Sequence, residues 1–283
     1  MAVADAGSLA GAGSRLNRSP SAVSMMLKQF EDHLGQALFE TDRKRDLSAL
    51  GLFVLEQARS ELRQFDRSVT SIEQYARTGI GVVRVAAVPS VAGTVLPVAL
   101  ATFLGEHPDI RVKLGDMDSS HVLQALEQGR VDLGIASAAD RSWTAGRSHL
   151  FDDEFGLVCR ADHALAAQGG PLGWAALANE PFIGNELCER IDAKAPRALC
   201  ARARLFVQNT GSLLAMVREG LGVTVLPRTV MALPGADLSF RPMSDPCARR
   251  RIDLLYRTGG TMSSLTETLV RHVVAAALPS SGA

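Results

Sequence analysis

A heptad pattern of apolar residues runs through residues 51–78, between positions that are often charged. The apolar positions recur in alternating steps of three and four, and they are Leu55, Ala58, Leu62, Phe65, Val69, Ile72 and Ala76. One helix over this stretch would be about 42 Å long, too long and too exposed to pack only on its own domain. The pattern therefore predicts a linker helix and hinge over 51–79 and dimerisation through Leu55, Leu62, Phe65, Val69 and Ile72.

The segment before the linker, residues 1–50, has the pattern of two short helices joined by a tight turn. Ser8 is placed to cap the first helix, and Ser19 followed by Pro20 is a typical start for the second. The second helix carries apolar residues at helical spacing that we expect to face a core: Val23, Met26, Leu27, Phe30 and Leu34.

The other face of the second helix carries Ser21, Ser24, Met25 and Lys28, small or extended side chains that suit a DNA major groove. Residues 43–45 are basic and lie between apolar residues. This pattern is typical of a wing that contacts DNA phosphates. A helical hairpin with a solvated basic turn explains the same pattern. The formal net charge of the chain is zero, so composition gives no support for a nucleic-acid partner.

A gapless series of residues carries a family resemblance: Ala2–Leu9, Leu16, Ser19–Ser24, Lys28, Phe30–Glu31, Leu34–Gly35, Leu38–Glu40 and Arg43. It resembles the winged helix-turn-helix of LysR-type transcriptional regulators. The resemblance implies an all-α winged domain over 1–50, with a recognition helix over 21–34, that binds double-stranded DNA. The implied DNA contacts are Ser19, Ser21, Ala22, Ser24, Met25, Lys28, Arg43, Lys44 and Arg45. Family members usually have a longer first helix, so we expect this one to be truncated.

Residues 80–283 alternate strand and helix patterns, which predicts a mostly parallel sheet with helices around it. The expected strands are 82–88, 110–114, 131–136, 155–159, 182–183, 205–207, 223–226 and 252–256. Ser90 is expected to cap a helix that runs to His107. The last strand and a helix over 264–278 return the chain to the first half. The expected division is lobe I from 80–158 and 256–283, and lobe II from 159–255.

Three segments of this region, 84–90, 126–132 and 220–227, resemble the effector-binding domain of LysR regulators. The resemblance implies a two-lobed α/β fold like that of type II periplasmic binding proteins, with a small-molecule effector between the lobes. Helix N-termini at the carboxyl ends of strands attract anions, so we expect a small organic anion. The expected effector-binding residues are Ser90, Val91, Ser119, Ser137, Asn185, Asn209 and Thr210. Helix capping explains the serines and Asn209 equally well, and His121 is the histidine nearest to them.

Motifs of other function classes do not occur in the sequence. It has no G-x-S-x-G, P-loop, H-E-x-x-H or strand-linked dinucleotide motif, so we expect neither an enzyme nor a bound cofactor. The histidines are scattered and the four cysteines form no C-x-x-C pair, so we expect no metal site. No apolar run of about 18 residues and no signal-peptide pattern occurs, so we expect a cytoplasmic protein without a membrane partner.

Cys188 and Cys200 support a second hypothesis. Peroxide-sensing members of the family keep a redox pair in the second half of the sensor, so the resemblance implies a reversible disulfide here. Two free cysteines explain the sequence as well. An effector-binding dimer that has lost operator binding also remains open. A solute-binding protein without DNA activity would show a signal peptide and no helix-turn-helix pattern, and the sequence shows the reverse. The resemblance further implies a homodimer that pairs into a dimer of dimers, a homotetramer.

Overall fold

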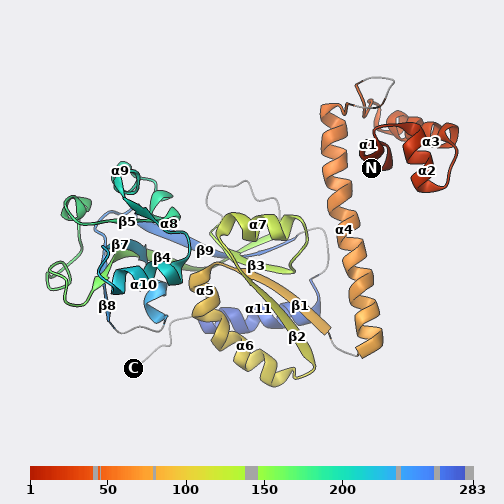
Figure 1. Ribbon diagram of the computed structural model, residues 1–283. Helices are drawn as coiled ribbons and strands as arrows, with labels where there is room; N and C mark the ends of the chain where they lie inside the picture. The colour runs from red at the N-terminus through yellow and green to blue at the C-terminus, as the bar shows by residue number, and fades with distance from the viewer. Residues whose placement is uncertain are drawn as a thin grey trace. The chain divides into compact units, whose positions relative to one another are not determined.

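The computed structural model describes residues 1–40, 44, 46–78, 81–137, 146–233, 237–257 and 262–277. The chain forms two compact units, Met1–Gly79 and Ile80–Ala283 (Figure 1). The described residues of the first unit form helices and an isolated β-bridge, whereas the second unit is built on a mixed sheet. Across the described ranges, no helix is long and apolar enough to cross a membrane.

The first unit has the predicted helix-turn-helix. Its helices are α1 (Ala2–Ala6), α2 (Leu9–Leu16), α3 (Pro20–Leu34) and α4 (Ala49–Thr78). The hydroxyl of Ser8 accepts a hydrogen bond from the Gly11 amide at 3.1 Å, and the hydroxyl of Ser19 accepts one from the Ala22 amide at 3.2 Å. Both predicted N-caps are therefore confirmed. Asn17 adopts a left-handed conformation that this residue type tolerates, which produces the tight turn between α2 and α3.

The predicted core face of α3 is only partly buried. Val23 is buried with Val3 and Ala12, and Leu27 is packed against the same cluster. Met26 and Phe30, in contrast, are 59% and 44% exposed. The expectation that the whole stripe faces a core is therefore wrong for this chain. The physical reason is that α1 and α2 are short, so the cluster that they form with α3 covers Val23 and Leu27 but leaves Met26 and Phe30 uncovered.

After α3, Phe39 and Leu47 form an antiparallel bridge, on either side of the segment where a wing is expected. Leu38 and Phe39 are buried in the cluster of the first unit. The 30-residue helix α4 then follows as one uninterrupted element, as the heptad pattern predicts.

The second unit contains a seven-stranded sheet in the order β2-β1-β3-β9-β4-β7, with β8 also paired to β4. The strands are β1 (Gly81–Ala87), β2 (Ile110–Asp116), β3 (Leu133–Ala136), β4 (Gly146–Arg160), β7 (Thr224–Pro227), β8 (Leu238–Pro242) and β9 (Arg249–Tyr256). A separate parallel pair is formed by β5 (Ile183–Gly184) and β6 (Leu205–Phe206). The expected two-lobed α/β fold class is confirmed.

Helices cover the sheet in both lobes (Figure 1). Around β1, β2, β3 and β9 lie α5 (Pro89–Gly93), α6 (Val95–Glu106), α7 (Ser119–Glu127) and α11 (Ser264–Ala277). Around β7 and β8 lie α8 (Glu186–Glu189), α9 (Lys194–Arg202), α10 (Thr210–Arg218) and the 3-10 helices η1 (Trp174–Leu177) and η2 (Arg228–Ala232). The hydrophobic side chains form separate clusters in the two lobes.

Two long antiparallel strands join the lobes. The first part of β4, up to Glu154, pairs with β9, and its second part, from Phe155, pairs with β7 and β8. The lobe boundaries expected after residues 158 and 255 fall inside β4 and β9. These strands belong to both lobes, so the connection between the lobes is a hydrogen-bonded ribbon.

The helix expected from Ser90 to His107 is two helices, so that expectation is corrected. Thr94 separates α5 from α6, and Ser90 lies inside α5, whose N-cap position is Val88. Ser90 is therefore not a helix cap. Similarly, Asp118 rather than a serine caps α7, because its carboxylate accepts hydrogen bonds from the Ser120 and His121 amides.

Candidate functional site

The exposed face of α3 is the candidate nucleic-acid interface. Ser21, Ser24, Met25 and Lys28 are all exposed on it, whereas Ala22 is half-buried. The hydroxyl of Ser19 caps the helix and lies 3.1 Å from the hydroxyl of Ser21. The structure thus brings the expected helix residues together on one surface whose side chains are mostly short.

The structure describes Lys44, one of the three expected wing residues. Arg43 and Arg45 lie outside the described residues. Lys44 is described, and its Nζ lies 3.4 Å from both carboxylate oxygens of Glu31 and 5.5 Å from the centre of the Phe39 ring. Glu31 also accepts a hydrogen bond from the Leu38 amide at 2.8 Å. Glu31 therefore ties Leu38 and Lys44 to α3, a role that sequence reasoning did not find.

The heptad seam of α4 is largely exposed to solvent in the single chain. Phe65 and Ile72 are 64% and 68% exposed, Leu62 and Val69 are also exposed, and Leu55 is half-buried. Exposing a row of large apolar side chains to water costs free energy. Covering the row with another apolar surface removes that cost. The seam has the form of an unpaired interface.

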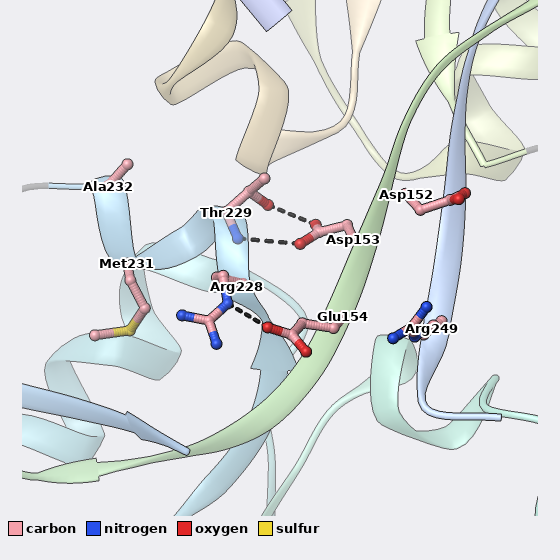
Figure 2. Close-up of a pocket in the computed structure, with 8 residues that line it drawn as sticks. All are labelled: Asp152, Asp153, Glu154, Arg228, Thr229, Met231, Ala232 and Arg249. Atoms are coloured by element: carbon pink, nitrogen blue, oxygen red, sulfur yellow. Dashed lines mark hydrogen bonds and ion pairs between the residues drawn. The ribbon is translucent and has the colours of Figure 1, made fainter. Parts of the chain in front are cut away.

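A pocket of about 660 Å³ lies beside the ribbon that joins the lobes (Figure 2). It is lined by Asp152, Asp153, Glu154, Arg228, Thr229, Met231, Ala232 and Arg249. The acids come from β4, Arg249 comes from β9, and the others come from η2. None of the expected effector-binding residues lines this pocket, so the residues that line it were not predicted from the sequence. The available signal was the acidic run 152–154, which faces the basic run 249–251 in register across the ribbon.

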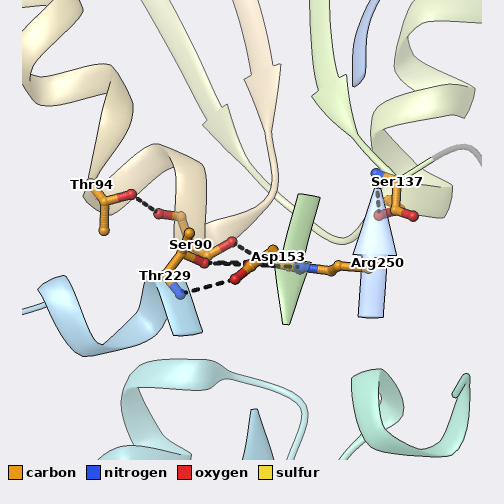
Figure 3. A network of polar contacts seen from close by, with 7 residues as sticks. Ser90, Thr94, Ser137, Asp153, Thr229 and Arg250 are labelled. Carbon is orange, nitrogen blue, oxygen red and sulfur yellow. Dashed lines mark hydrogen bonds and ion pairs between the residues drawn. The ribbon is translucent and has the colours of Figure 1, made fainter. Parts of the chain in front are cut away.

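Next to this pocket, Ser90 belongs to a buried polar network (Figure 3). Arg250 Nη2 donates to the Ser90 hydroxyl at 2.6 Å and to Asp153 Oδ2 at 2.8 Å. The Thr229 hydroxyl donates to the same Asp153 oxygen at 2.6 Å. Burial lowers the pKa of Arg250, and Asp153 opposes that effect. The guanidinium nevertheless stays charged, because an arginine side chain is not deprotonated in proteins.

The other expected lobe I residues lie at the ends of β3 and α7. The Ser119 hydroxyl accepts a hydrogen bond from the Ser137 amide at 3.2 Å, and Ser137 is half-buried. The Val91 side chain is fully buried in the lobe I core. Val91 therefore offers no side-chain surface to a ligand.

The expected lobe II residues are engaged in structural contacts. The amide group of Asn185 donates to the Thr224 hydroxyl at 2.9 Å, and its oxygen accepts from the Cys188 amide at 2.9 Å. The side chain of Asn209 caps α10 by accepting from the Ser212 amide at 3.0 Å, and Thr210 is buried. In the described part of the chain, no hydrogen bond joins these residues to the three serines of lobe I.

The Asp118 carboxylate and the His121 ring are in hydrogen-bonding contact at the N-terminus of α7. Partial burial raises the pKa of Asp118, but hydrogen bonds from Ser120 and His121 outweigh this and lower it to about 2. His121 is exposed and serves as a partner of the helix cap. No cluster of metal-ligating side chains occurs among the residues that the structure describes.

Cys188 in α8 and Cys200 in α9 belong to the same buried cluster of lobe II, and the Cys200 thiol donates to the Asn185 carbonyl oxygen at 3.7 Å. Their mutual hydrogen bond and burial raise the pKa of Cys188, whereas the hydrogen bond from Cys188 lowers the pKa of Cys200 to about 7. Both side chains are buried and neither forms a disulfide. The pair that the sequence singled out is therefore adjacent in space.

Two family models match the chain. Residues 1–51 match the model described as "Bacterial regulatory helix-turn-helix protein, lysR family", and residues 76–278 match the "LysR substrate binding domain". Together they include the α3 surface and the whole ribbon between the lobes, whereas most of α4 lies between the two matches.

Individual proteins are similar over almost the same length. The HTH-type transcriptional regulator YfeR of Shigella flexneri is 27% identical over 277 residues, which cover 94% of this chain and 88% of that protein. A probable hydrogen peroxide-inducible genes activator of Streptomyces viridosporus is 28% identical, with 91% and 86% covered. The solved structure of full-length CbnR with its target DNA has a TM-score of 0.57 and 22% identity, with 97% of this chain and 96% of that chain covered.

Proposed function

Because the chain belongs to the LysR family of bacterial helix-turn-helix transcriptional regulators, we propose specific roles for its surfaces. Helix α3 and the wing at 43–45 contact operator DNA, α4 pairs two chains, and a small organic anion between the lobes modulates DNA binding. The four segments expected from the sequence, 1–50, 51–79 and the two lobes, carry these roles. The regulator acts in the cytoplasm, where its DNA is, and catalyses no reaction.

The exposed face of α3 carries the DNA-binding part of the proposal. Ser21 and Ser24 are short, so the helix backbone can approach base edges closely, and Lys28 supplies a positive charge for phosphate. Ser19, Ala22, Met25, Arg43, Lys44 and Arg45 complete the proposed contact surface. Lys44 would exchange its contact with Glu31 for phosphate, which favours a wing that is positioned before DNA arrives.

The exposed seam of α4 supports dimerisation. A dimer presents two recognition helices to two half-sites, which raises affinity without a large net charge. The solved CbnR structure holds its target DNA and shares the fold along nearly the whole chain. We extend the proposal to a dimer of dimers as the active assembly.

The effector site is proposed at the ends of the strands that face the other lobe. Ser90, Ser119 and Ser137 supply hydroxyls from lobe I, while Asn185, Asn209 and Thr210 supply polar groups from lobe II. Val91 supports Ser90 from the core. A pocket of about 660 Å³ beside Ser90 is large enough for a small organic acid.

The DNA-binding proposal is tested by a mobility-shift assay with the full chain. The probe is duplex DNA from upstream of the chain's own gene, and the reference is a duplex of equal length from within the coding sequence. Ser24→Glu should weaken binding about tenfold or more, because a carboxylate in the groove faces base edges and phosphates. Gln36→Glu, which adds the same charge beyond the end of α3, should bind like the wild type.

Equal, weak binding of both duplexes by the wild type would instead favour the effector-binding dimer without operator binding. Effector binding can be measured separately from DNA binding. Small carboxylates that bind the sensor should raise the melting temperature of the protein whether or not it binds DNA. Benzoate and succinate are suitable first probes. A Ser119→Ala variant should lose such a shift if the proposed site is correct.

A second candidate function, thiol redox sensing, is favoured by the adjacent Cys188 and Cys200 side chains. With hydrogen peroxide as oxidant, one thiolate attacks an oxygen and forms a sulfenic acid, and the second thiol displaces water to form the disulfide. The overall reaction converts two thiols and one peroxide to one disulfide and two waters. Mass spectrometry of peroxide-treated protein should then show a peptide linked through these cysteines, which Cys188→Ser abolishes. Two alkylatable thiols after treatment would remove this candidate.

A further inference from the structure

The network around Arg250 links the two lobes through side chains as well as through the ribbon (Figure 3). Arg250 on β9 donates to Ser90 in α5, which belongs to lobe I. Asp153 on β4 accepts from the amide of Thr229 at 3.2 Å and from its hydroxyl at 2.6 Å, and η2, which carries Thr229, belongs to lobe II. The ion pair thus lies where the lobes meet, with one hydroxyl partner in each.

Burial makes this arrangement energetically demanding. Asp153 is 2% exposed and Arg250 is 9% exposed, so both charges are removed from water. A buried ion pair contributes little net stability compared with apolar residues of similar volume, whereas loss of one partner is strongly destabilising. The network is therefore better explained by its fixing one arrangement of the groups it joins than by a contribution to stability.

The neighbouring contacts show which geometry the network specifies. Helix α5 lies against η2, and a Cβ atom added at Gly93 would come within 2.3 Å of the Leu233 side chain just beyond η2. Any rotation of the lobes about the ribbon would change the distance between α5 and η2. It would break the hydrogen bond that Arg250 donates to Ser90 or the pair of hydrogen bonds that Thr229 donates to Asp153.

We propose that Asp153 and Arg250 form an interlobe latch that holds Ser90 and Thr229 at one separation and so sets the resting angle between the lobes. The inference deepens the proposed function, since it rests on Ser90 being an effector contact. An effector group that hydrogen-bonds Ser90 competes with Arg250 for that hydroxyl. Effector binding then weakens the lobe I side of the latch and shifts the population of lobe angles.

The latch is tested by interlobe distances in the full chain without any effector. Spin labels on Thr102→Cys in α6 and Ala198→Cys in α9, both exposed sites, report the distance in a Cys247→Ser background, because the other cysteines are buried. Labelled chains are mixed with an excess of unlabelled chains, so that each pair reports one molecule. Ser90→Ala and Thr229→Val each remove one hydroxyl from the latch, one in each lobe.

Both variants should broaden the distance distribution and add a population at a second distance. Thr94→Val is the matched control, since its hydroxyl bonds only the Ser90 carbonyl within the same lobe. Wild-type distributions for both latch variants, or equal broadening by the control, would overturn the proposal. The outcome does not depend on DNA binding, so failure of the mobility-shift assay and failure of the latch are distinguishable.

Discussion

Gly13 shows how one backbone position sets the packing of the helix-turn-helix. A Cβ atom there would lie 2.7 Å from the carbonyl oxygen of Arg18, because α2 approaches the turn before α3 closely. A backbone carbonyl cannot move aside as the end of a side chain can. The glycine that lowers helix propensity in α2 is therefore required by the close approach to the turn.

Gly13→Ala should destabilise the first unit by about 1–3 kcal/mol, because the clash outweighs the gain in helix propensity. Gly105→Ala is the matched change near the end of α6, where no atom lies within 4 Å of the added Cβ. That variant should gain about 0.5–1 kcal/mol. Hydrogen exchange of peptides from α2, α3 and α6 measures both effects, and faster exchange in α6 for Gly105→Ala would contradict this account.

Asp118 should make the stability of lobe I depend on pH in the acid range. Its pKa is lowered from 3.8 to about 2, so the folded state prefers the carboxylate. The stabilisation is complete above pH 3.8 and is lost as the pH falls through about 2. Asp118→Asn keeps a capping oxygen without a titrating group. Urea unfolding should show the wild type as more stable than this variant at neutral pH, with the difference shrinking below about pH 4.

Among the single elements, helix α4 satisfies its own backbone hydrogen bonds but does not bury its apolar side chains. Its backbone hydrogen bonds are satisfied within the helix, yet Phe65 and Ile72 remain exposed. Among the described residues, Leu62 and Val69 are also exposed. The stability of this element is therefore expected to depend on protein concentration, as in other helices that pair through an apolar seam.

Phe65→Asp should shift the chain from dimer to monomer, because a carboxylate in the seam would be buried without a partner. Thr70→Asp introduces the same charge on another face of α4, where the side chain is exposed, and should leave the dimer intact. Sedimentation velocity at several concentrations measures the association state. A dimer that survives Phe65→Asp would show that other surfaces hold the chains together.

Several strands and helices were not predicted from the sequence. The strand at 146–154 was missed because its residues are largely polar and charged and show no clear alternation, although it pairs with β9 along nearly its whole length. Strand β8 and helix α9 were missed as well. The helix at 90–107 was expected as one element, although Gly93, the last residue of α5, and Pro97, in the first turn of α6, flank the break at Thr94.

For the whole molecule, DNA affinity should depend on charge placement rather than on net charge, which is zero. Each Lys28 that neutralises a phosphate contributes close to one unit to the slope of log affinity against log salt. Lys28→Ala should therefore reduce that slope by about two in a dimer. Lys113→Ala, an exposed lysine on β2, should leave the slope unchanged. Fluorescence anisotropy over a salt series distinguishes these outcomes, and an unchanged slope for Lys28→Ala would remove Lys28 from the interface.

Short-range patterns were sufficient for the helix-turn-helix, its caps, the linker helix and the alternation of strands and helices in the sensor. These features depend on hydrogen bonds and side-chain spacings within a few residues, which the order of amino acids displays directly. The tertiary structure alone decided that Glu31 holds Lys44, that Met26 and Phe30 stay exposed, and that Ser90 meets Arg250. Ser90 and Arg250 are 160 residues apart, so their contact depends on how the strands pair, and no local pattern records that pairing.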